Sequence, residues 1–121
     1  MNRKRILVID DDEALCEGMA FILRDEGHLV ENTSDTAQGR ELIGKYTFDI
    51  AILDNKMPGL TGAEMLKEIK EKCPETAVFI VSGWPAIGKF LEEDKVTHLL
   101  AGIMGKPFTE KDLLDMLAQV Q

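Results

Sequence analysis

The sequence predicts an α/β fold: a doubly wound, five-stranded parallel sheet in the order 2-1-3-4-5, with helices on both faces. One observation predicts this fold, and a second predicts that it forms a single domain. First, short apolar runs alternate along the chain with segments whose apolar residues recur at helical spacing, and such strands pair in parallel through right-handed crossovers. Second, the 121 residues are 45% hydrophobic and 30% charged, which suits a single core. We therefore expect residues 1–121 to form one domain.

The first half of the chain contains three predicted strands and two predicted helices. In order, they are a buried strand at residues 5–10, a helix at 13–26, a weaker strand at 28–33, a short helix at 36–46 and a strong buried strand at 48–53. The buried strands are nearly continuous apolar runs, which is typical of strands covered on both faces. The first helix stops at Gly27, and Ser34 or Asp35 is suited to cap the second.

The second half contains the remaining elements. They are a helix at residues 62–73, a strand at 76–81, a less regular stretch at 83–105 and a closing helix at 109–120. The helix at 62–73 ends before Pro74, because the residue that precedes a proline disfavours helical backbone. The stretch 83–105 is expected to hold one helix, at about 86–93, and the fifth strand. Thr109 and Asp112 have the spacing of an N-terminal capping pair.

Polar residues follow four of the predicted strands at the point where each strand ends. They are Asp10, Asp11 and Asp12 after the first strand, Asp54 after the third, Ser82 after the fourth and Lys106 after the fifth. The first and third strands are neighbours in the predicted order, so we expect Asp10, Asp11 and Asp54 to converge in one pocket. Two carboxylates 4 Å apart repel by about 4 kcal/mol near a protein surface, a cost that a bound cation would offset.

The chemistry of this pocket suits Mg²⁺ or Mn²⁺ and a phosphoryl group. Mg²⁺ takes oxygen ligands and commonly binds one or two carboxylates together with phosphate oxygens. An aspartate carboxylate acts as a nucleophile in reactions that form acyl phosphates. In this interpretation Asp54 attacks phosphorus, and Lys106 and Ser82 hold the oxygens of the transferring group. Asp10 and Asp11 then hold the metal.

The chain resembles, over its whole length, the receiver domains of two-component response regulators. The resemblance rests on four motifs, which are ILVIDDDE with the acidic pair, AILDNKMPGLTG with Asp54, VFIVSG with Ser82 and GKPF with Lys106. Four motifs in this order and at these spacings are specific. The resemblance implies a flavodoxin-like receiver fold, with Asp54 as the phosphoacceptor. It also implies a donor, which is a sensor histidine kinase or a histidine phosphotransfer protein.

The resemblance implies further details that the spacing does not show. The backbone carbonyl of Lys56 is expected to bind the metal, and Pro58 and Gly59 are expected to shape the loop. The Lys106–Pro107 peptide bond is expected to be cis. Receivers catalyse their own phosphorylation and usually their own slow dephosphorylation. We therefore expect mainly a signalling switch, with this chemistry built in.

Phosphorylation is expected to shift the surface formed by the fourth helix, the fifth strand and the fifth helix. That surface would then favour an output domain, a protein partner or a second copy of the chain. The expected switch residues are Ser82 and Ile103, and Ile103 stands where the family commonly carries an aromatic residue. The usual switch through a buried aromatic side chain is therefore in question. The stretch 83–105 is either a specialised partner surface or a mobile region.

Charge and cysteine content oppose several other functions. The net charge of −8 opposes direct binding to nucleic acid or to an anionic membrane, because both carry the same sign. The first apolar run is too short for a signal peptide or a membrane span, so we expect a cytoplasmic protein. Cys16 and Cys73 lack the spacing of a zinc or redox pair, and Cys16 is expected to pack in the core.

Two alternatives remain open from the sequence. Asp10 and Asp12 resemble the nucleophile motif of haloacid-dehalogenase-type phosphatases, in which Asp10 would be phosphorylated. The threonine that this family carries soon afterwards and its second acidic motif are missing here. The other alternative is a receiver-like scaffold that no longer uses phosphate. The complete set of site residues opposes it, whereas Ile103 favours it slightly. That set is Asp10, Asp11, Asp54, Ser82 and Lys106.

Overall fold

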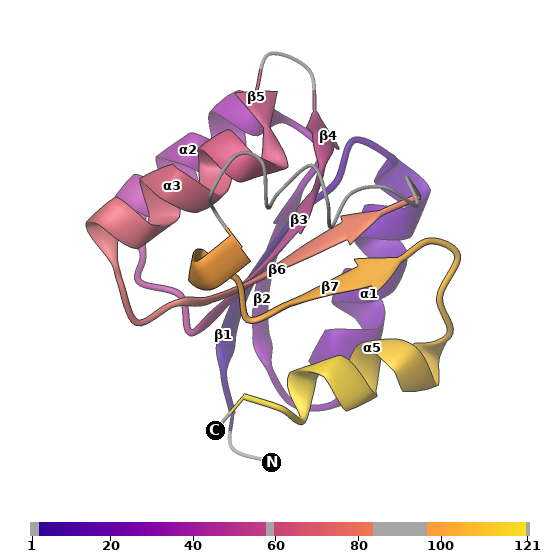
Figure 1. The fold of residues 1–121 in the computed structure, drawn as a ribbon. Coiled ribbons are helices and arrows are strands. Elements are labelled where there is room, and N and C mark those ends of the chain that lie inside the picture. The colour runs from indigo at the N-terminus through magenta and orange to yellow at the C-terminus, as the bar shows by residue number, and fades with distance from the viewer. Residues whose placement is uncertain (1–2, 58–59, 84–96, 121) are drawn as a thin grey trace.

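The structure contains a five-stranded parallel sheet, as the sequence predicts (Figure 1). It is a computed structural model in which residues 3–57, 60–83 and 97–120 are described. The strands are β1 (Arg5–Ile9), β2 (Leu29–Thr33), β3 (Ile50–Asp54), β6 (Ala77–Ser82) and β7 (Gly102–Gly105). They lie side by side in the order β2-β1-β3-β6-β7, which is 2-1-3-4-5 when the strands of this sheet are counted along the chain. The predicted fold class is confirmed.

Helices cover both faces of the sheet. They are α1 (Glu13–Asp25), α2 (Thr36–Lys45), α3 (Gly62–Lys72) and α5 (Glu110–Leu117), together with the short 3₁₀ helix η1 (Thr97–Leu99). Helices α1 and α5 pack on one face, and α2 and α3 pack on the other (Figure 1). Across the described ranges, no helix has the length and apolar character needed to cross a membrane.

The sheet divides the core into two layers, because successive side chains of a strand point to opposite faces. On β1, Leu7 and Ile9 pack toward α2 and α3, whereas Ile6 and Val8 pack toward α1 and α5. A fully buried side chain of this size stabilises the fold by about 1.5–3 kcal/mol. The central strand β3 is buried along its whole length, so its last residue, Asp54, is held by apolar packing on both faces.

Side-chain caps fix the start of three helices. Asp12 caps α1 and Asp35 caps α2, each by accepting a hydrogen bond from a backbone N–H two or three residues later. Of the two candidates that the sequence offers for α2, Ser34 and Asp35, the cap is therefore Asp35. Thr109 and Asp112 form the predicted capping box, in which each side chain accepts a hydrogen bond from the backbone of the other. Loss of such a cap typically costs about 1 kcal/mol.

The observed element bounds differ from the predicted ones by up to three residues. The closing helix α5 ends at Leu117 rather than at residue 120. After Leu117 the backbone tightens into a turn in which the Val120 N–H donates a 3.0 Å hydrogen bond to the Leu117 carbonyl, three residues back. The structure adds a small antiparallel pair, β4 (Lys56–Met57) and β5 (Leu60–Thr61). Two-residue strands are too short to show a period in the sequence. The predicted helix at 86–93 lies outside the described residues.

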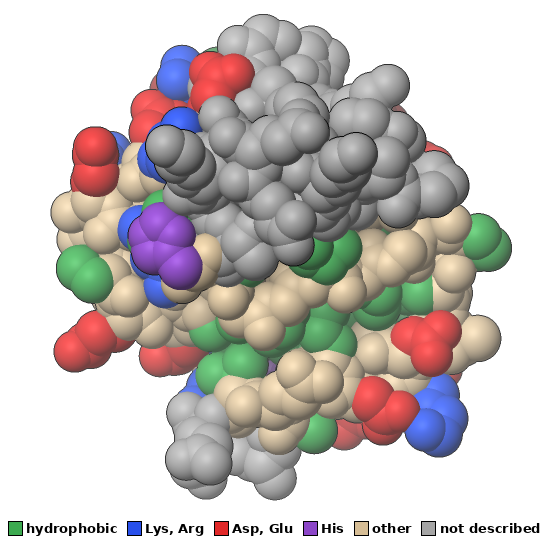
Figure 2. Space-filling view, viewed as in Figure 1, with side chains coloured by type: hydrophobic (Ala, Val, Ile, Leu, Met, Phe, Trp, Pro, Cys, Tyr) green, Lys and Arg blue, Asp and Glu red, His purple; other side chains and the backbone are tan. Residues whose placement is uncertain are grey.

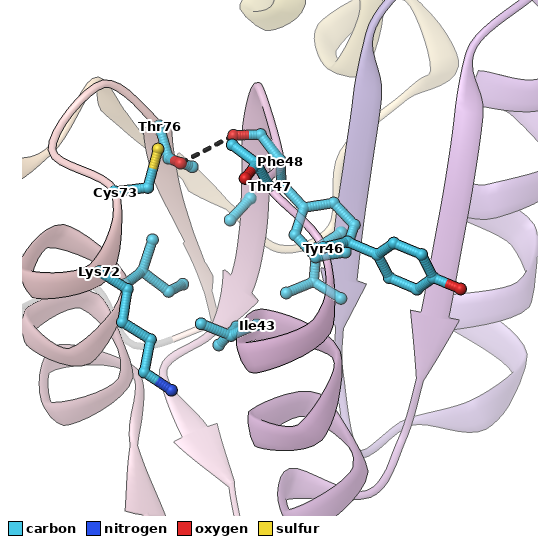
Figure 3. A pocket seen from close by; sticks show the side chains of 10 residues that line it. Ile43, Tyr46, Thr47, Phe48, Lys72, Cys73 and Thr76 are labelled. Carbon is cyan, nitrogen blue, oxygen red and sulfur yellow. Dashed lines mark hydrogen bonds between the residues drawn. The ribbon is translucent and has the colours of Figure 1, made fainter.

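A small cavity lies between α2, α3 and the strands β1 and β3 (Figure 3). Its volume is about 50 Å³, and its walls combine apolar side chains such as Ile43 and Phe48 with polar ones such as Lys72. The Thr76 hydroxyl beside it donates a 2.7 Å hydrogen bond to the Phe48 carbonyl. Small-molecule sites usually enclose about 300–1,000 Å³, so this cavity is too small for a typical small-molecule ligand. Cys73 is half-buried beside it, whereas Cys16 is buried in the core as predicted.

Candidate functional site

The carboxyl edge of the sheet brings the predicted site residues together. Asp54 is the last residue of β3 and Ser82 is the last residue of β6, while Asp10 and Lys106 directly follow β1 and β7. Strands β1 and β3 are paired in parallel, so Asp10 and Asp54 leave neighbouring strands at the same level. The side chains of Asp10, Asp54 and Ser82 are buried. Parallel pairing thus produces the convergence that the spacing predicts.

Lys106 pairs with both buried carboxylates. Its Nζ atom lies 2.9 Å from Oδ2 of Asp10 and 3.2 Å from Oδ1 of Asp54. Burial acts to lower the pKa of Lys106, but the two carboxylates outweigh it and raise this pKa above its ordinary value. The Lys106 backbone N–H also donates a 2.8 Å hydrogen bond to the Ser82 carbonyl, which ties β7 to the end of β6. Lys106 is therefore a fixed positive charge at the site.

The Asp54 carboxyl group lies in a crowded anionic pocket. Burial, a hydrogen bond with Asp11 and the charge of Asp10 raise its pKa from the ordinary 3.8 to about 6, while Lys106 acts to lower it. A group with this pKa is mostly ionised at neutral pH, but its ionised form is held at a cost in free energy. A further cation at the site would remove that cost.

The arrangement of carboxylates suits a metal ion. Ligand oxygens of Asp10, Asp11 and Asp54 all lie within 4.8 Å of one another, with Asp10 and Asp54 buried and Asp11 exposed. Oδ1 of Asp10 accepts a 2.9 Å hydrogen bond from the Asp12 N–H, whereas its buried Oδ2 lies 2.9 Å from the Lys106 ammonium as an ion pair. Hard divalent cations prefer oxygen ligands of this kind. The cluster therefore has the chemistry of a divalent-cation site.

The loop after Asp54 depends on two residues that the sequence motifs did not single out. Gly62, the first residue of α3, donates a 2.9 Å hydrogen bond from its N–H to the Asn55 carbonyl. A Cβ atom at position 62 would lie 2.9 Å from the Asp54 carbonyl oxygen and 3.0 Å from Cα of Asn55. Glycine thus allows α3 to start directly against the strand end. The signal in the sequence is a glycine at the start of a predicted helix, a few residues after Asp54.

The remaining predicted site residues have varied positions. The Lys106–Pro107 peptide bond is cis, the form that the resemblance implies. Lys56 begins β4, next to the carboxyl end of β3. Pro58 and Gly59 lie outside the described residues. Ile103 lies on β7 and 40% of it is exposed, so it stands at the surface instead of filling the core.

Residues 6–118 match the family model of the response regulator receiver domain. Cell cycle response regulator CtrA of Brucella ovis is 33% identical over 113 residues, which cover 91% of this chain and 47% of CtrA. Chemotaxis response regulator CheY4 of Vibrio cholerae has a TM-score of 0.87 at 26% identity, covering 99% of this chain and 100% of its own. NtrX of Brucella abortus has a TM-score of 0.87 at 27% identity, covering 98% of this chain and 27% of NtrX.

These similarities favour the receiver interpretation over the phosphatase alternative. The chain spans about half the length of the curated relatives it matches. The family model covers nearly all of this chain, and the structural similarity extends over the same residues. The chain belongs to the response regulator receiver domains of two-component signalling systems.

Proposed function

We propose that this receiver domain accepts a phosphoryl group on Asp54 from a phosphohistidine. The donor would be a sensor histidine kinase or a histidine phosphotransfer protein. The position of Asp54 carries the proposal. The residue ends the central strand and is 7% exposed, and its carboxylate lies 3.2 Å from the Lys106 ammonium. A carboxylate beside a fixed cation is suited to attack an anionic phosphoryl group that it would otherwise repel.

The transfer forms one bond and breaks one bond. An oxygen of Asp54 bonds to phosphorus while the bond between phosphorus and the imidazole nitrogen of the donor breaks, and the electron pair of that bond leaves with the nitrogen. Lys106 would pair with one oxygen of the transferring group, and the Ser82 hydroxyl would donate a hydrogen bond to another. An acyl phosphate remains on Asp54. Its hydrolysis restores the carboxylate and ends the signal.

We infer that Asp10, Asp11 and Asp54 hold Mg²⁺ or Mn²⁺, with the backbone carbonyl of Lys56 as a further ligand. Three carboxylates with oxygens within 4.8 Å of one another carry a charge of about −3, and one lysine offsets only one of these charges. A divalent cation would bring the net charge of the pocket to zero. When bound, such an ion neutralises negative charge on phosphoryl oxygens. Asp10 is held for this purpose by burial and by the hydrogen bond from the Asp12 N–H.

Phosphorylation would change the surface formed by β7, α5 and the expected fourth helix, which lies outside the described residues. The phosphoryl group adds a charge of about −1.5 to −2, which would draw Lys106 and Ser82 toward it. Both residues sit at the ends of the strands next to that surface. Ile103 projects from β7 with 40% of its area exposed, so we assign it a contact with the partner in place of an inward-turning aromatic residue. The partner would be an output domain, another protein or a second copy of the chain.

The proposed partners are proteins, and the proposed location is the cytoplasm. A net charge of −8 opposes direct contact with nucleic acid or with an anionic membrane surface. Any output on DNA would therefore depend on another domain or another protein. The chain would act mainly as a switch, with its own phosphorylation and slow dephosphorylation as its chemistry.

Mapping the phosphorylated residue tests the proposal. The full chain is incubated with acetyl phosphate and Mg²⁺, treated with borohydride to reduce an aspartyl phosphate to homoserine, and digested for mass spectrometry. We expect homoserine at position 54, both in the wild type and in the control Asp115→Asn, which changes an exposed carboxylate on α5. Homoserine at position 10 would support the phosphatase instead. Homoserine at neither position would support a phosphate-independent scaffold.

A further inference from the structure

We propose that His28 acts as a pH-sensitive latch that ties the start of β1 to the turn between α1 and β2 and releases it when the imidazole is protonated. His28 lies at the amino-terminal end of the sheet, opposite the edge that carries Asp54. The turn before it contains Gly27 with a φ of 95°, a conformation that favours glycine. The backbone N–H of His28 donates a 3.2 Å hydrogen bond to the Leu23 carbonyl, which fixes the residue against α1.

The hydrogen bond to the imidazole defines its tautomer. Nδ1 of His28 accepts a 3.0 Å hydrogen bond from the backbone N–H of Lys4. A backbone N–H only donates, so Nδ1 carries no proton and the neutral ring carries its proton on Nε2. Next to this contact, the Leu29 N–H donates a 2.9 Å hydrogen bond to the Lys4 carbonyl. The two hydrogen bonds together hold Lys4 at the start of the pairing between β1 and β2.

The surroundings of His28 do not accommodate an imidazolium. The residue is 5% exposed, and among the residues that the structure describes its buried Nε2 has no hydrogen-bond partner. Protonation of Nδ1 would place an N–H donor against the Lys4 N–H donor. Neither ring donor would then have an acceptor within the described part of the chain. Burying a polar group without a partner costs about 1–3 kcal/mol, and more when it is charged. Protonation therefore favours a state in which the ring leaves its site.

The charges around His28 support the same direction. Burial lowers its pKa below the ordinary 6.5, while Glu26, at the end of α1, acts to raise it. The positive charge of Lys4 acts to lower it further. A group whose pKa is lower in the folded chain stabilises the closed form at high pH. This contribution is lost as the pH falls below about 6.5, because the open form then binds the extra proton.

The tautomer is the first test, and it uses the wild-type chain. Nitrogen-15 NMR of the imidazole at neutral pH reports which ring nitrogen carries the proton. We expect the proton on Nε2 of His28. A proton on Nδ1 would overturn the proposal, since the Lys4 N–H would then have no acceptor.

Amide hydrogen exchange is the second test. Between about pH 7 and pH 5, the protection factors of the Lys4 and Leu29 amides should fall about tenfold relative to that of Ala77. The Ala77 amide is the internal control, because it bonds to the Asp49 carbonyl at the same end of the sheet without contacting His28. The variant His28→Asn keeps an acceptor for the Lys4 N–H but does not titrate, so we expect no such fall in it. The latch would be overturned if the protection factors of all three wild-type amides changed equally with pH, or if the Lys4 and Leu29 amides lost the same protection in His28→Asn.

Discussion

Asp54 occupies a position that favours its proposed role and disfavours the stability of the metal-free fold. Its carboxyl group is buried among other carboxylates, and its pKa is raised to about 6. The nearby Lys106 offsets only part of that repulsion, because it also pairs with Asp10. The folded chain therefore holds a charged group that it would hold more easily if it were neutral. This makes Asp54 a residue at which loss of function and gain of stability go together.

Asp54→Asn is expected to stabilise the metal-free protein at about pH 7, raising the midpoint of thermal unfolding by several degrees. The variant removes a carboxylate whose ionisation costs more in the folded chain than in the unfolded one. The gain should shrink as the pH falls through about 6 and vanish well below 3.8, where the wild-type group is protonated in both states. Asp115→Asn, on the exposed face of α5, should show no such dependence. A gain that is equal at both ends of this range would contradict the account.

At the residue scale, the sequence predicts which side chains converge at the site, but it does not predict which atoms of them form ion pairs and hydrogen bonds. Asp10, Asp54, Ser82 and Lys106 lie at or directly after strand ends, so the parallel topology alone places them at one edge. The double ion pair of Lys106 depends on distances of 2.9 and 3.2 Å that no spacing encodes. The role of Gly62 is also absent from the pattern, because it arises from the approach of one helix end to the backbone of a strand.

At the element scale, two glycines in helices differ in the space that an added Cβ atom would have. Gly18 lies within α1, where an added Cβ would meet nothing within 4 Å, whereas a Cβ at Gly62 would lie 2.9 Å from the Asp54 carbonyl. Gly18→Ala should therefore stabilise the fold by about 0.5–1 kcal/mol, the usual gain for a helix interior. Gly62→Ala should destabilise it by about 1–3 kcal/mol, as overpacking does.

Urea unfolding of the two glycine variants against the wild type measures both effects. Gly62→Ala should also lower the yield of phosphorylated protein, because its Cβ presses on the strand end that carries Asp54. Gly18→Ala should leave that yield unchanged. The packing account fails if both variants change stability in the same direction.

The elements themselves are largely predictable, because their apolar periods are strong and their caps are local. Asp12 and the pair Thr109 and Asp112 cap helices where the sequence expects a helix to begin. Helix ends are harder to predict, as α5 shows, since the apolar Val120 continues the period after the backbone has tightened into a turn. The β4–β5 pair escapes prediction because two residues carry no period.

At the scale of the whole molecule, binding of Mg²⁺ at the acidic edge should stabilise the fold. A ligand that binds only the folded chain, present at about ten times its dissociation constant, adds about 1.4 kcal/mol. Thermal unfolding with increasing Mg²⁺ should therefore show a rising midpoint in the wild type and a smaller rise in Asp10→Asn. Asp25→Asn, at the exposed end of α1, serves as the control and should behave like the wild type. An identical rise in Asp10→Asn would place the ion elsewhere.

The overall architecture is predictable from the sequence because alternating strands and helices allow few topologies. The strand order 2-1-3-4-5 also determines which strand ends meet at the site.

The partner surface is less predictable. Its expected fourth helix at 86–93 lies outside the described residues, and Ile103 departs from the family pattern. The groove between β7 and α5 has both carboxylates and apolar side chains in its lining, among them Asp112, Asp115, Ile103 and Met116. Figure 2 shows this face of the molecule, with hydrophobic side chains beside acidic ones.

The most direct test of the central claim is the intact mass of the full chain after incubation with acetyl phosphate. The wild type and Asp54→Asn are compared with and without Mg²⁺. The account predicts a gain of one phosphoryl group that requires both Mg²⁺ and Asp54. A gain of the same size in Asp54→Asn, or no gain in the wild type even though Mg²⁺ binds, would contradict it.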